Sequence, residues 1–288
     1  MATLIELIKI LRDRTGAGMM DCKKALVENN EDIEKAIDWL REKGIAKAAK
    51  KSSRIAAEGA THVVYCPECH KSLIFEINCE TDFVAKSDAF KDLVKDSANA
   101  IMNSEIHCID CCKKAVEPLF NDAVIKLGEK LDFRRYEIVN TDPSNGVGTY
   151  IHMGGKISVL VVLEKEDAEL AKGIAMTIAA TTPSYLSRED VPEDVVARET
   201  AVQLESAKND ERLAGKPEAA LAKIIEGKVN KALAESIALE QVYVLDQTKK
   251  IKDILGSNKL LKFIRYQVGE GLEKRVDNFA EEVMNQAK

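Results

Sequence analysis

Hydrophobic residues recur three and four positions apart in the first part of the chain, as they do on one face of a helix. This spacing is present in residues 4–11, 19–27 and 33–40, and it predicts three helices. Gly44 has the position of a C-terminal cap for the third helix. Residues 1–56 are therefore expected to form a small helical domain.

The pattern changes to period two after a linker at 45–57, which is rich in alanine and lysine and is expected to be helical. Apolar and polar residues alternate in 72–79, which predicts a strand with one buried face. Residues 62–65 are expected to pair with this strand as an antiparallel hairpin. A helix with one apolar face is predicted to follow from Ser87.

The same order of two strands and a helix occurs again later in the chain. The alternation in 157–163 repeats that of 73–79 at an offset of 84 residues, with 150–153 as the expected hairpin partner. A last strand also occurs twice, at 133–138 and at 263–268, with an offset of 130 residues. The difference between the two offsets is 46 residues, which predicts an insertion of that order in the second copy.

Two apolar stripes at helical spacing flank a turn within the insertion, which predicts two antiparallel helices. The whole pattern predicts an α+β chain with a three-helix bundle, a duplicated strand-strand-helix-strand core with antiparallel sheets, an inserted antiparallel helical hairpin and a C-terminal helix. The expected boundaries are 1–56 for the helical domain, 57–142 for the N-terminal core subdomain, 143–187 with 246–270 for the C-terminal core subdomain, 188–245 for the hairpin and 271–288 for the last helix.

Charge and hydropathy narrow the class of partner. Charged residues make up 31% of the 288 residues, and the formal net charge is −6. Without a basic excess, the chain is not expected to bind nucleic acid through the phosphate backbone. No apolar run approaches the ~20 residues that span a bilayer, and no signal peptide is predicted. We therefore expect a cytoplasmic protein whose partner is another protein or a small ligand.

One connection is longer in the first copy than in the second. Eleven positions separate Cys79 from the helix residue Phe90, whereas seven separate Leu163 from Leu170. An aromatic side chain in such a connection either closes the core or is offered to a partner as an anchor. The acid beside this aromatic residue, Asp82, is accompanied by no histidine, cysteine or second acid with a clear acid-base role. The four extra residues coincide with the segment Thr81, Asp82, Phe83 and Val84.

Three segments of the chain resemble the signature segments of the bacterial elongation factor Ts family. They are Gly16–Leu26, Asn78–Ala85 and Val268–Gly271, and the resemblance extends over essentially the whole chain. It implies a guanine-nucleotide exchange factor for the translational GTPase elongation factor Tu, with no covalent chemistry and no cofactor of its own. It also implies a ubiquitin-associated-like N-terminal domain and a helical hairpin that makes a homodimer.

The resemblance also implies roles for individual residues. The segment from Thr81 to Val84 would enter the GTPase and displace the magnesium ion that helps hold the nucleotide, with Phe83 as the wedge. The further contacts to the GTPase would be Met19, Met20, Leu127, Gly128 and His152. A helix-packing role for the two methionines and a structural role for His152 stay open as alternatives.

The seven cysteines are an odd number in a chain with no predicted secretory signal, which argues for thiols or metal ligands. Four of them form two Cys-x-x-Cys units, the spacing of thiolate ligands in tetrahedral zinc sites. The strand 72–79 and the helix after it have similar expected lengths, so the second unit would return to the first. We therefore predict a structural zinc site, with unligated thiols as the open alternative. The predicted ligands are Cys66, Cys69, Cys108 and Cys111, and the substitutes are His70, His107 and Cys112.

Other interpretations of the cysteines are weaker. A redox dithiol is disfavoured because no strand-helix context like that of thioredoxin is predicted around either pair. A zinc-knuckle module for RNA or protein would need basic and aromatic neighbours, and Lys71, Lys113 and Lys114 are the basic ones. An enzyme with a reactive cysteine would need a poised base, and His107 is only a sequence neighbour of Cys108.

Overall fold

The N-terminal helices form as the apolar spacing predicts. The computed structural model describes residues 3–51, 53–210 and 217–273. Its first helices are α1 (Leu4–Thr15), α2 (Met19–Glu28) and α3 (Ile33–Lys51). Their apolar faces meet in one small core that includes Leu11, Cys22, Leu26, Ala36 and Leu40.

The third helix does not end at Gly44, so the predicted cap is wrong. Helix α3 continues to Lys51, so the first part of the linker is helical as expected but belongs to α3, and residues 53–57 are not helical. A Cβ atom on Gly44 would lie 2.5 Å from a side-chain carbon of Ile125. The glycine therefore permits close packing of α3 against α6 (Ile109–Leu127) rather than a change of chain direction.

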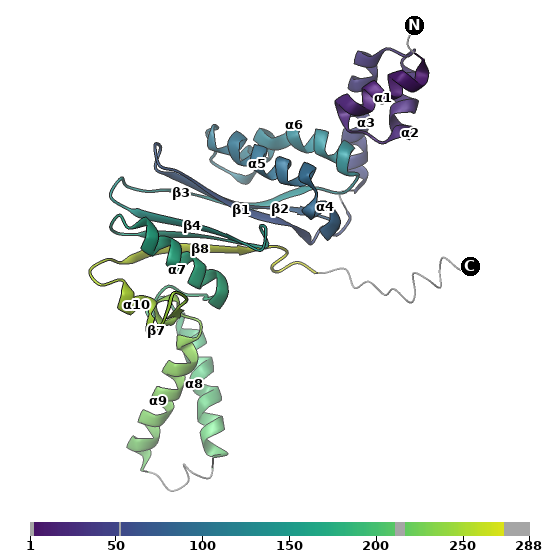
Figure 1. The fold of residues 1–288 in the computed structure, drawn as a ribbon. Coiled ribbons are helices and arrows are strands. Elements are labelled where there is room, and N and C mark those ends of the chain that lie inside the picture. Colours follow the sequence, from purple (N-terminus) through teal and green to yellow (C-terminus); the bar gives the residue numbers. More distant parts are fainter. Residues whose placement is uncertain (1–2, 52, 211–216, 274–288) are drawn as a thin grey trace.

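The first sheet is antiparallel, with the order β1-β2-β3. Its strands are β1 (Glu58–Cys66), β2 (Lys71–Cys79) and β3 (Asp132–Asn140). The helices α5 (Asp88–Met102) and α6 cover its outer face (Figure 1). Helix α6 is absent from the sequence-based prediction, although Cys112, Val116 and Phe120 recur at helical spacing; Pro118 interrupts the usual helix signal.

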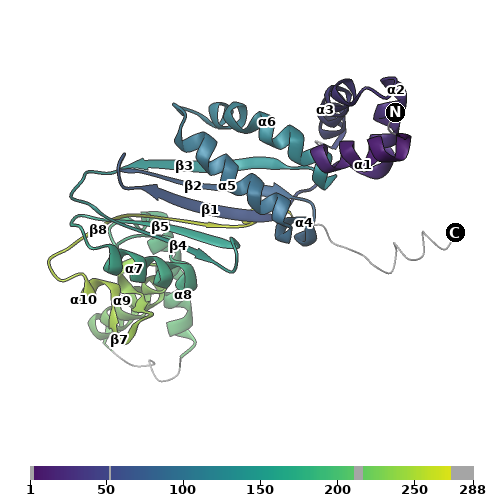
Figure 2. The same cartoon turned by 45° about the horizontal axis from the view of Figure 1, so that its top comes forward.

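The second sheet repeats this arrangement with the order β4-β5-β8. Its strands are β4 (Gly146–His152), β5 (Ile157–Leu163) and β8 (Leu260–Gln267). Helix α7 (Ala168–Thr181) covers its outer face, and the two sheets lie face to face (Figures 1 and 2). The predicted duplication of two strands, a helix and a later strand is thus present in three dimensions.

Strand β2 is buried on both faces, not on one as the alternation predicts. One face packs under α5, and the other meets the second sheet. The Thr61 hydroxyl on β1 donates to the Gly155 carbonyl at 2.9 Å, and its oxygen lies 2.9 Å from the Ser158 hydroxyl oxygen. The core between the sheets contains Val63, Ile74, Leu160, Ile264 and Tyr266.

A buried carboxylate joins the two halves of the molecule. Glu76 on β2 is fully buried, and it accepts hydrogen bonds from Arg134 at 3.0 Å and from Arg135 at 2.6 Å. It also accepts the backbone N–H of Gly269 at 2.8 Å. Arg134 in turn donates to the carbonyl of Glu270. The segment Val268–Gly271 therefore closes the second half of the chain onto the first.

The insertion projects from the core as two antiparallel helices (Figure 1). They are α8 (Glu193–Lys208) and α9 (Glu218–Ala234), and their contact buries Ala207, Ile225 and Val229. The turn expected between them lies mostly outside the described residues. Short elements then lead to β8: η1 (Ala238–Glu240), β6 (Val242–Tyr243), β7 (Asp246–Lys250) and α10 (Ile251–Ile254).

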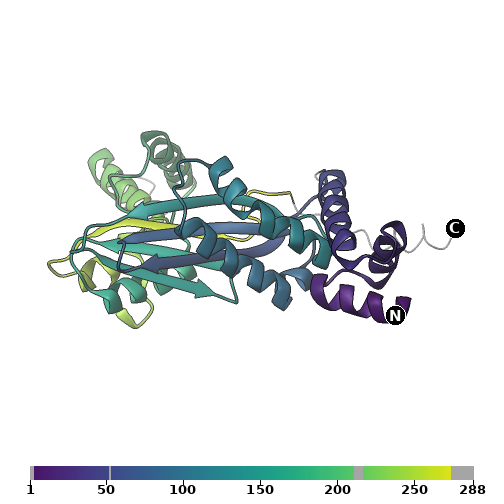
Figure 3. The same cartoon turned by 90° about the horizontal axis from the view of Figure 1, so that it is seen from above.

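The helical domain and the C-terminus complete the architecture. The helical domain lies at one end of the sheets, next to the end of α6 (Figure 3). The predicted C-terminal helix, 271–288, falls almost entirely outside the described residues, and Gly271–Glu273 are not helical.

Candidate functional site

The most exposed aromatic side chain of the described structure lies where β2 passes into α4 (Asp82–Lys86). Phe83 on this short helix is 82% exposed. Its neighbours Val84 and Ala85 face the core of the first half and attach the helix to it. Phe90 at the start of α5 is fully buried and closes the core beneath. Phe83 therefore does not plug the core.

Two carboxylates hold this corner in place. Glu129 accepts hydrogen bonds from the Glu80 N–H at 2.9 Å, from the Thr81 N–H at 3.0 Å and from the Thr81 hydroxyl at 2.6 Å. Glu80 accepts the Lys130 N–H at 2.7 Å and pairs with Arg54 at 3.2 Å. The segment at the end of β2 and the segment after α6 thus each supply a carboxylate to the backbone of the other. We call this arrangement the Glu80–Glu129 clamp.

The helix α4 is also fixed at its own ends. The Thr81 hydroxyl accepts the Val84 N–H at 3.3 Å as an N-cap. Asp82 pairs with Lys86 at 2.6 Å, and the hydrogen bond from this ammonium lowers the pKa of the Asp82 carboxyl. Asp82 is therefore a charged, paired carboxylate, which agrees with the absence of an acid-base role.

The predicted contact residues outside the segment 81–84 form three groups along the chain. Leu127 and Gly128 end α6, and Gly128 adopts a left-handed conformation with φ 71° one residue before Glu129 of the clamp. This places them beside the Phe83 corner. Met19 and Met20 lie in the separate helical domain, at the start of α2, where both are exposed, Met20 by 73%. A core-packing role does not fit that exposure.

His152 ends β4, where its Nδ1 lies 3.1 Å from the Tyr150 hydroxyl. The turn that follows comes next to α4, because Ala85 and Gly154 line one shared hollow of about 180 Å³. Met153 in this turn is 72% exposed. The tertiary structure thus gathers the segment 81–84, the end of α6 and the β4–β5 turn at one end of the sheets.

Sequence patterns missed three residues of this region. Glu80 and Glu129 carry no periodic signal, because an exposed acid at a strand or helix end is common. Met153 is preceded by a predicted contact residue and followed by Gly154 and Gly155. An apolar residue beside two glycines at a hairpin turn is the signal that could have found it.

The structure does not form the predicted zinc site. Cys66 and Cys69 flank the β1–β2 turn, whereas the Cys108 and Cys111 sulfurs lie 2.8 Å apart at the start of α6. Within 3–51, 53–210 and 217–273, no three His, Cys, Asp or Glu side chains are placed to hold a metal ion. Cys108 caps α6, and its sulfur accepts the N–H of Cys111 at 3.3 Å.

The three substitute ligands do not complete a site either. Cys112 is fully buried in the core, and burial raises its pKa to about 11. His70 and His107 belong to no metal-binding group among the described residues. Cys22 and Cys79 are fully buried as well, and burial raises the pKa of Cys79 to about 12.

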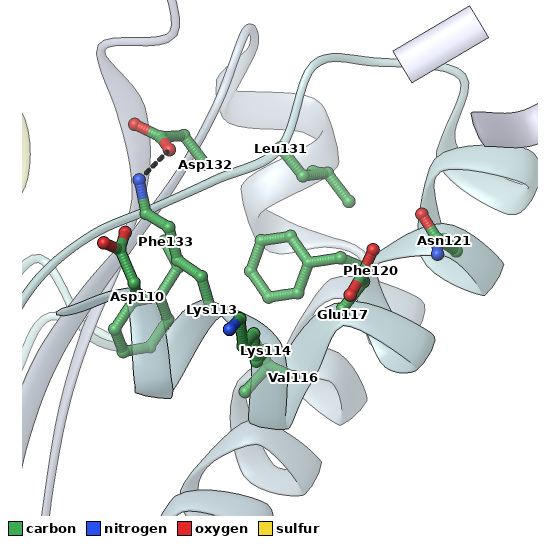
Figure 4. A pocket seen from close by; sticks show the side chains of 10 residues that line it. All are labelled: Asp110, Lys113, Lys114, Val116, Glu117, Phe120, Asn121, Leu131, Asp132 and Phe133. Carbon is green, nitrogen blue, oxygen red and sulfur yellow. Dashed lines mark ion pairs between the residues drawn. The ribbon is translucent and has the colours of Figure 1, made fainter. Parts of the chain in front are cut away.

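A further hollow lies elsewhere, between α6 and the start of β3 (Figure 4). Its volume is about 510 Å³. Phe120 and Leu131 give it an apolar wall, and Lys113 pairs with Asp132 at 3.8 Å across its rim. The charged groups that line it include both signs and belong mainly to one helix face. This mixture does not identify a class of ligand.

The family model described as Elongation factor TS matches residues 80–270, which is about two thirds of the 288 residues. None of the described helices has the length and apolar character needed to cross a membrane.

Proposed function

The chain belongs to the elongation factor Ts family, and we propose that it releases GDP from elongation factor Tu by inserting Phe83 and displacing the bound magnesium ion. Members of this family are guanine-nucleotide exchange factors rather than enzymes with covalent chemistry, and elongation factor Tu is the partner that the family implies. The proposal therefore concerns how this chain performs the exchange, and its expected place of action is the cytoplasm.

The observation that carries the proposal is the combination of exposure and rigidity at Phe83. Burying a phenylalanine side chain is worth about 1.5–3 kcal/mol, and here that free energy is left for a partner to gain. The capped helix and the Glu80–Glu129 clamp fix the backbone that carries the ring before binding, so little backbone conformational entropy is lost when the ring enters a pocket. A rigid aromatic anchor of this kind is typical of binding hot spots.

Exchange follows from thermodynamic linkage. A protein that binds the nucleotide-free GTPase more tightly than the GDP-bound form must weaken GDP binding by the same factor. Displacing a magnesium ion that bridges protein and phosphate is one physical route to this coupling. No reaction on this chain is needed, and GTP can then occupy the empty site.

Further contacts are proposed on either side of the wedge. Leu127, Gly128 and His152 lie at the same end of the sheets and would contact the GTPase around the inserted ring. Met19 and Met20 would contact it from the ubiquitin-associated-like domain, where exposed thioether side chains suit an adaptable surface.

We also propose that the hairpin of α8 and α9 makes a homodimer. Val202 on α8 is an apolar residue that is 55% exposed, and burial against a second hairpin would cover it. Sedimentation equilibrium should show a dimer that dissociates on dilution, and Val202→Asp should shift it to the monomer. A wild-type protein that stays monomeric at high micromolar concentration would contradict this proposal.

The exchange function is tested by mixing the protein with elongation factor Tu that carries a fluorescent GDP analogue, and chasing with excess GDP. The protein should accelerate the loss of fluorescence in proportion to its concentration until the GTPase is saturated. A rate of GDP release that stays at the intrinsic value of the GTPase at every concentration of the protein would contradict the proposed exchange function.

The clamp gives a more specific expectation. Glu129→Gln keeps the shape of the side chain but weakens the hydrogen bonds that position Thr81, since bonds to a charged acceptor are the stronger ones. We expect GDP release at saturating protein to slow by about 3- to 10-fold, from a loss of about 1 kcal/mol, and the melting temperature to fall by no more than about 2–4 °C. Glu226→Gln, an exposed change on α9, is the matched control. Equal rates for the two variants would show that the clamp does not position the wedge.

A further inference from the structure

The start of α6 carries a pair of thiols that nucleotide exchange does not use. Cys108 is the N-cap of this 19-residue helix, and its sulfur accepts the N–H of Cys111 at 3.3 Å. The two sulfurs are 2.8 Å apart. Cys108 is exposed and Cys111 is half-buried, so the pair can be reached from solvent.

We propose that Cys108 and Cys111 are a redox-active dithiol that reduces small-molecule disulfides and closes into a disulfide at the helix cap. The sequence disfavours this function because no strand-helix context is predicted around the cysteines. In the structure, helix α5 and not a strand precedes α6, but Cys108 directly caps a long helix that packs on a sheet. This is the kind of position at which reactive Cys-x-x-Cys pairs occur.

The reaction balances as two thiol–disulfide exchanges. The Cys108 thiolate attacks one sulfur of an external disulfide, the bond between its two sulfurs breaks, and one thiol leaves. The Cys111 thiolate then attacks the Cys108 sulfur of the mixed disulfide, and the second thiol leaves. Each leaving sulfur takes up one of the two protons that the cysteines release. The external disulfide is reduced, and the two cysteines are oxidised to one disulfide.

The geometry favours closure over two separate adducts. A disulfide bond is about 2.05 Å long, so the two sulfurs must approach by less than 1 Å from their present 2.8 Å. The helix behind them is held by buried residues of its next turns, Cys112 and Val116. Closure therefore needs only a small movement of the cap and no rearrangement of the core.

The other cysteines of the chain differ in this respect. The Cys66 thiol donates to Glu68 at 3.3 Å, and the Cys69 thiol lies 4.0 Å from the Cys66 carbonyl. Besides these contacts to oxygen atoms, the Cys69 thiol also interacts with the Cys66 thiol and raises its pKa. Cys22, Cys79 and Cys112 are fully buried. The cap of α6 is thus a place where two accessible sulfurs lie as close as 2.8 Å in the described structure.

The dithiol lies far from the proposed wedge. Helix α6 begins at the end of the sheets that carries the β1–β2 turn and ends beside α3 and the Phe83 corner (Figures 1 and 2). Oxidation at its start should therefore leave the exchange rate unchanged. This makes the dithiol independent of the proposed function, and either can fail without the other.

The test uses the folded full-length protein in which Cys66 and Cys69 are both replaced by serine. The accessible thiols are then those of Cys108 and Cys111. The probe is an aromatic disulfide, Ellman's reagent. We expect two aromatic thiols to be released for each protein and none to remain attached, with a Cys108–Cys111 linked peptide in the digest. Adding Cys111→Ser should stop the reaction at the first step and leave one aromatic thiol on Cys108.

Three outcomes would overturn the proposal. The first is retention of separate aromatic adducts on Cys108 and Cys111, and the second is no reaction of either thiol in the folded protein. The third is release of stoichiometric zinc on oxidation, measured with a zinc-sensitive dye, which would make the pair a metal site. The wild-type protein is mapped in parallel, so that a folding defect of the double serine variant does not decide the result.

Discussion

Replacing Phe83 by alanine is expected to slow GDP release from elongation factor Tu by about 30-fold or more at saturating protein. Truncating a hot-spot aromatic residue costs at least ~2 kcal/mol, and each ~1.4 kcal/mol is tenfold. Because the ring is 82% exposed in the free protein, the fold should lose less than ~0.5 kcal/mol. Stopped-flow release of a fluorescent GDP analogue, with thermal melting of the same samples, measures both effects.

The matched control for this variant is Leu245→Ala. Leu245 is 63% exposed at the β6–β7 turn, so its loss removes a similar exposed apolar side chain away from the proposed contact. Its exchange rate should equal that of the wild type. If Phe83→Ala also keeps the wild-type rate, Phe83 is not the wedge.

Chelation of magnesium separates the two parts of the proposed mechanism. With excess EDTA the ion is already gone, so wild-type protein and Phe83→Ala should release GDP at rates that differ much less than they do with magnesium present. A deficit of the same size in EDTA would mean that Phe83 contributes binding alone and does not act through the metal ion.

Replacing Glu76 by alanine should destabilise the fold by about 3–5 kcal/mol. The carboxylate is fully buried, and two arginines and the Gly269 N–H depend on it. Removing one member of a buried ion group leaves the others uncompensated, which costs roughly that amount. The value should lie near 3 kcal/mol, because the side chains of Arg134 and Arg135 are 20% and 27% exposed and regain some hydration.

Urea unfolding followed by circular dichroism measures the loss, and Glu205→Ala is the control. Glu205 forms an exposed pair with Lys208 on α8, and such pairs contribute less than ~1 kcal/mol. If Glu76→Ala unfolds at the same urea concentration as the control, Glu76 does not join the two halves. The prediction also gives the segment Val268–Gly271 a structural role, since its backbone is the partner of Glu76 and Arg134.

Patterns along the chain predicted most helices and strands, because helical and strand periodicity arise from which face of an element is buried. They failed where an element contacts more than one neighbour. Gly44 looks like a cap until α6 lies against it, and β2 alternates like a half-buried strand although a second sheet covers its other face. The alternation is weak evidence there, because Ile74 and Glu76 occupy one face for different reasons, packing and ion pairing.

The cysteines show a similar limit. Spacing and element length placed Cys66, Cys69, Cys108 and Cys111 within reach of one another, but length alone does not fix where a side chain points. In the structure, the capping hydrogen bond at the start of α6 orients Cys108 toward Cys111. The described residues bring no three potential ligands together, because the positions of side chains from distant segments are set by tertiary packing.

The sequence by itself determined the duplication, the insertion, the family resemblance and the extra segment at 81–84, because each of these is a statement about order and spacing. Only the tertiary structure decided that Phe83 is exposed. That depends on Phe90 filling the core beneath it and on Glu129, 46 positions further along the chain, which accepts the Thr81 N–H and hydroxyl. Exposure and rigidity are properties of packing between segments distant in sequence, and local periodicity carries no information about them.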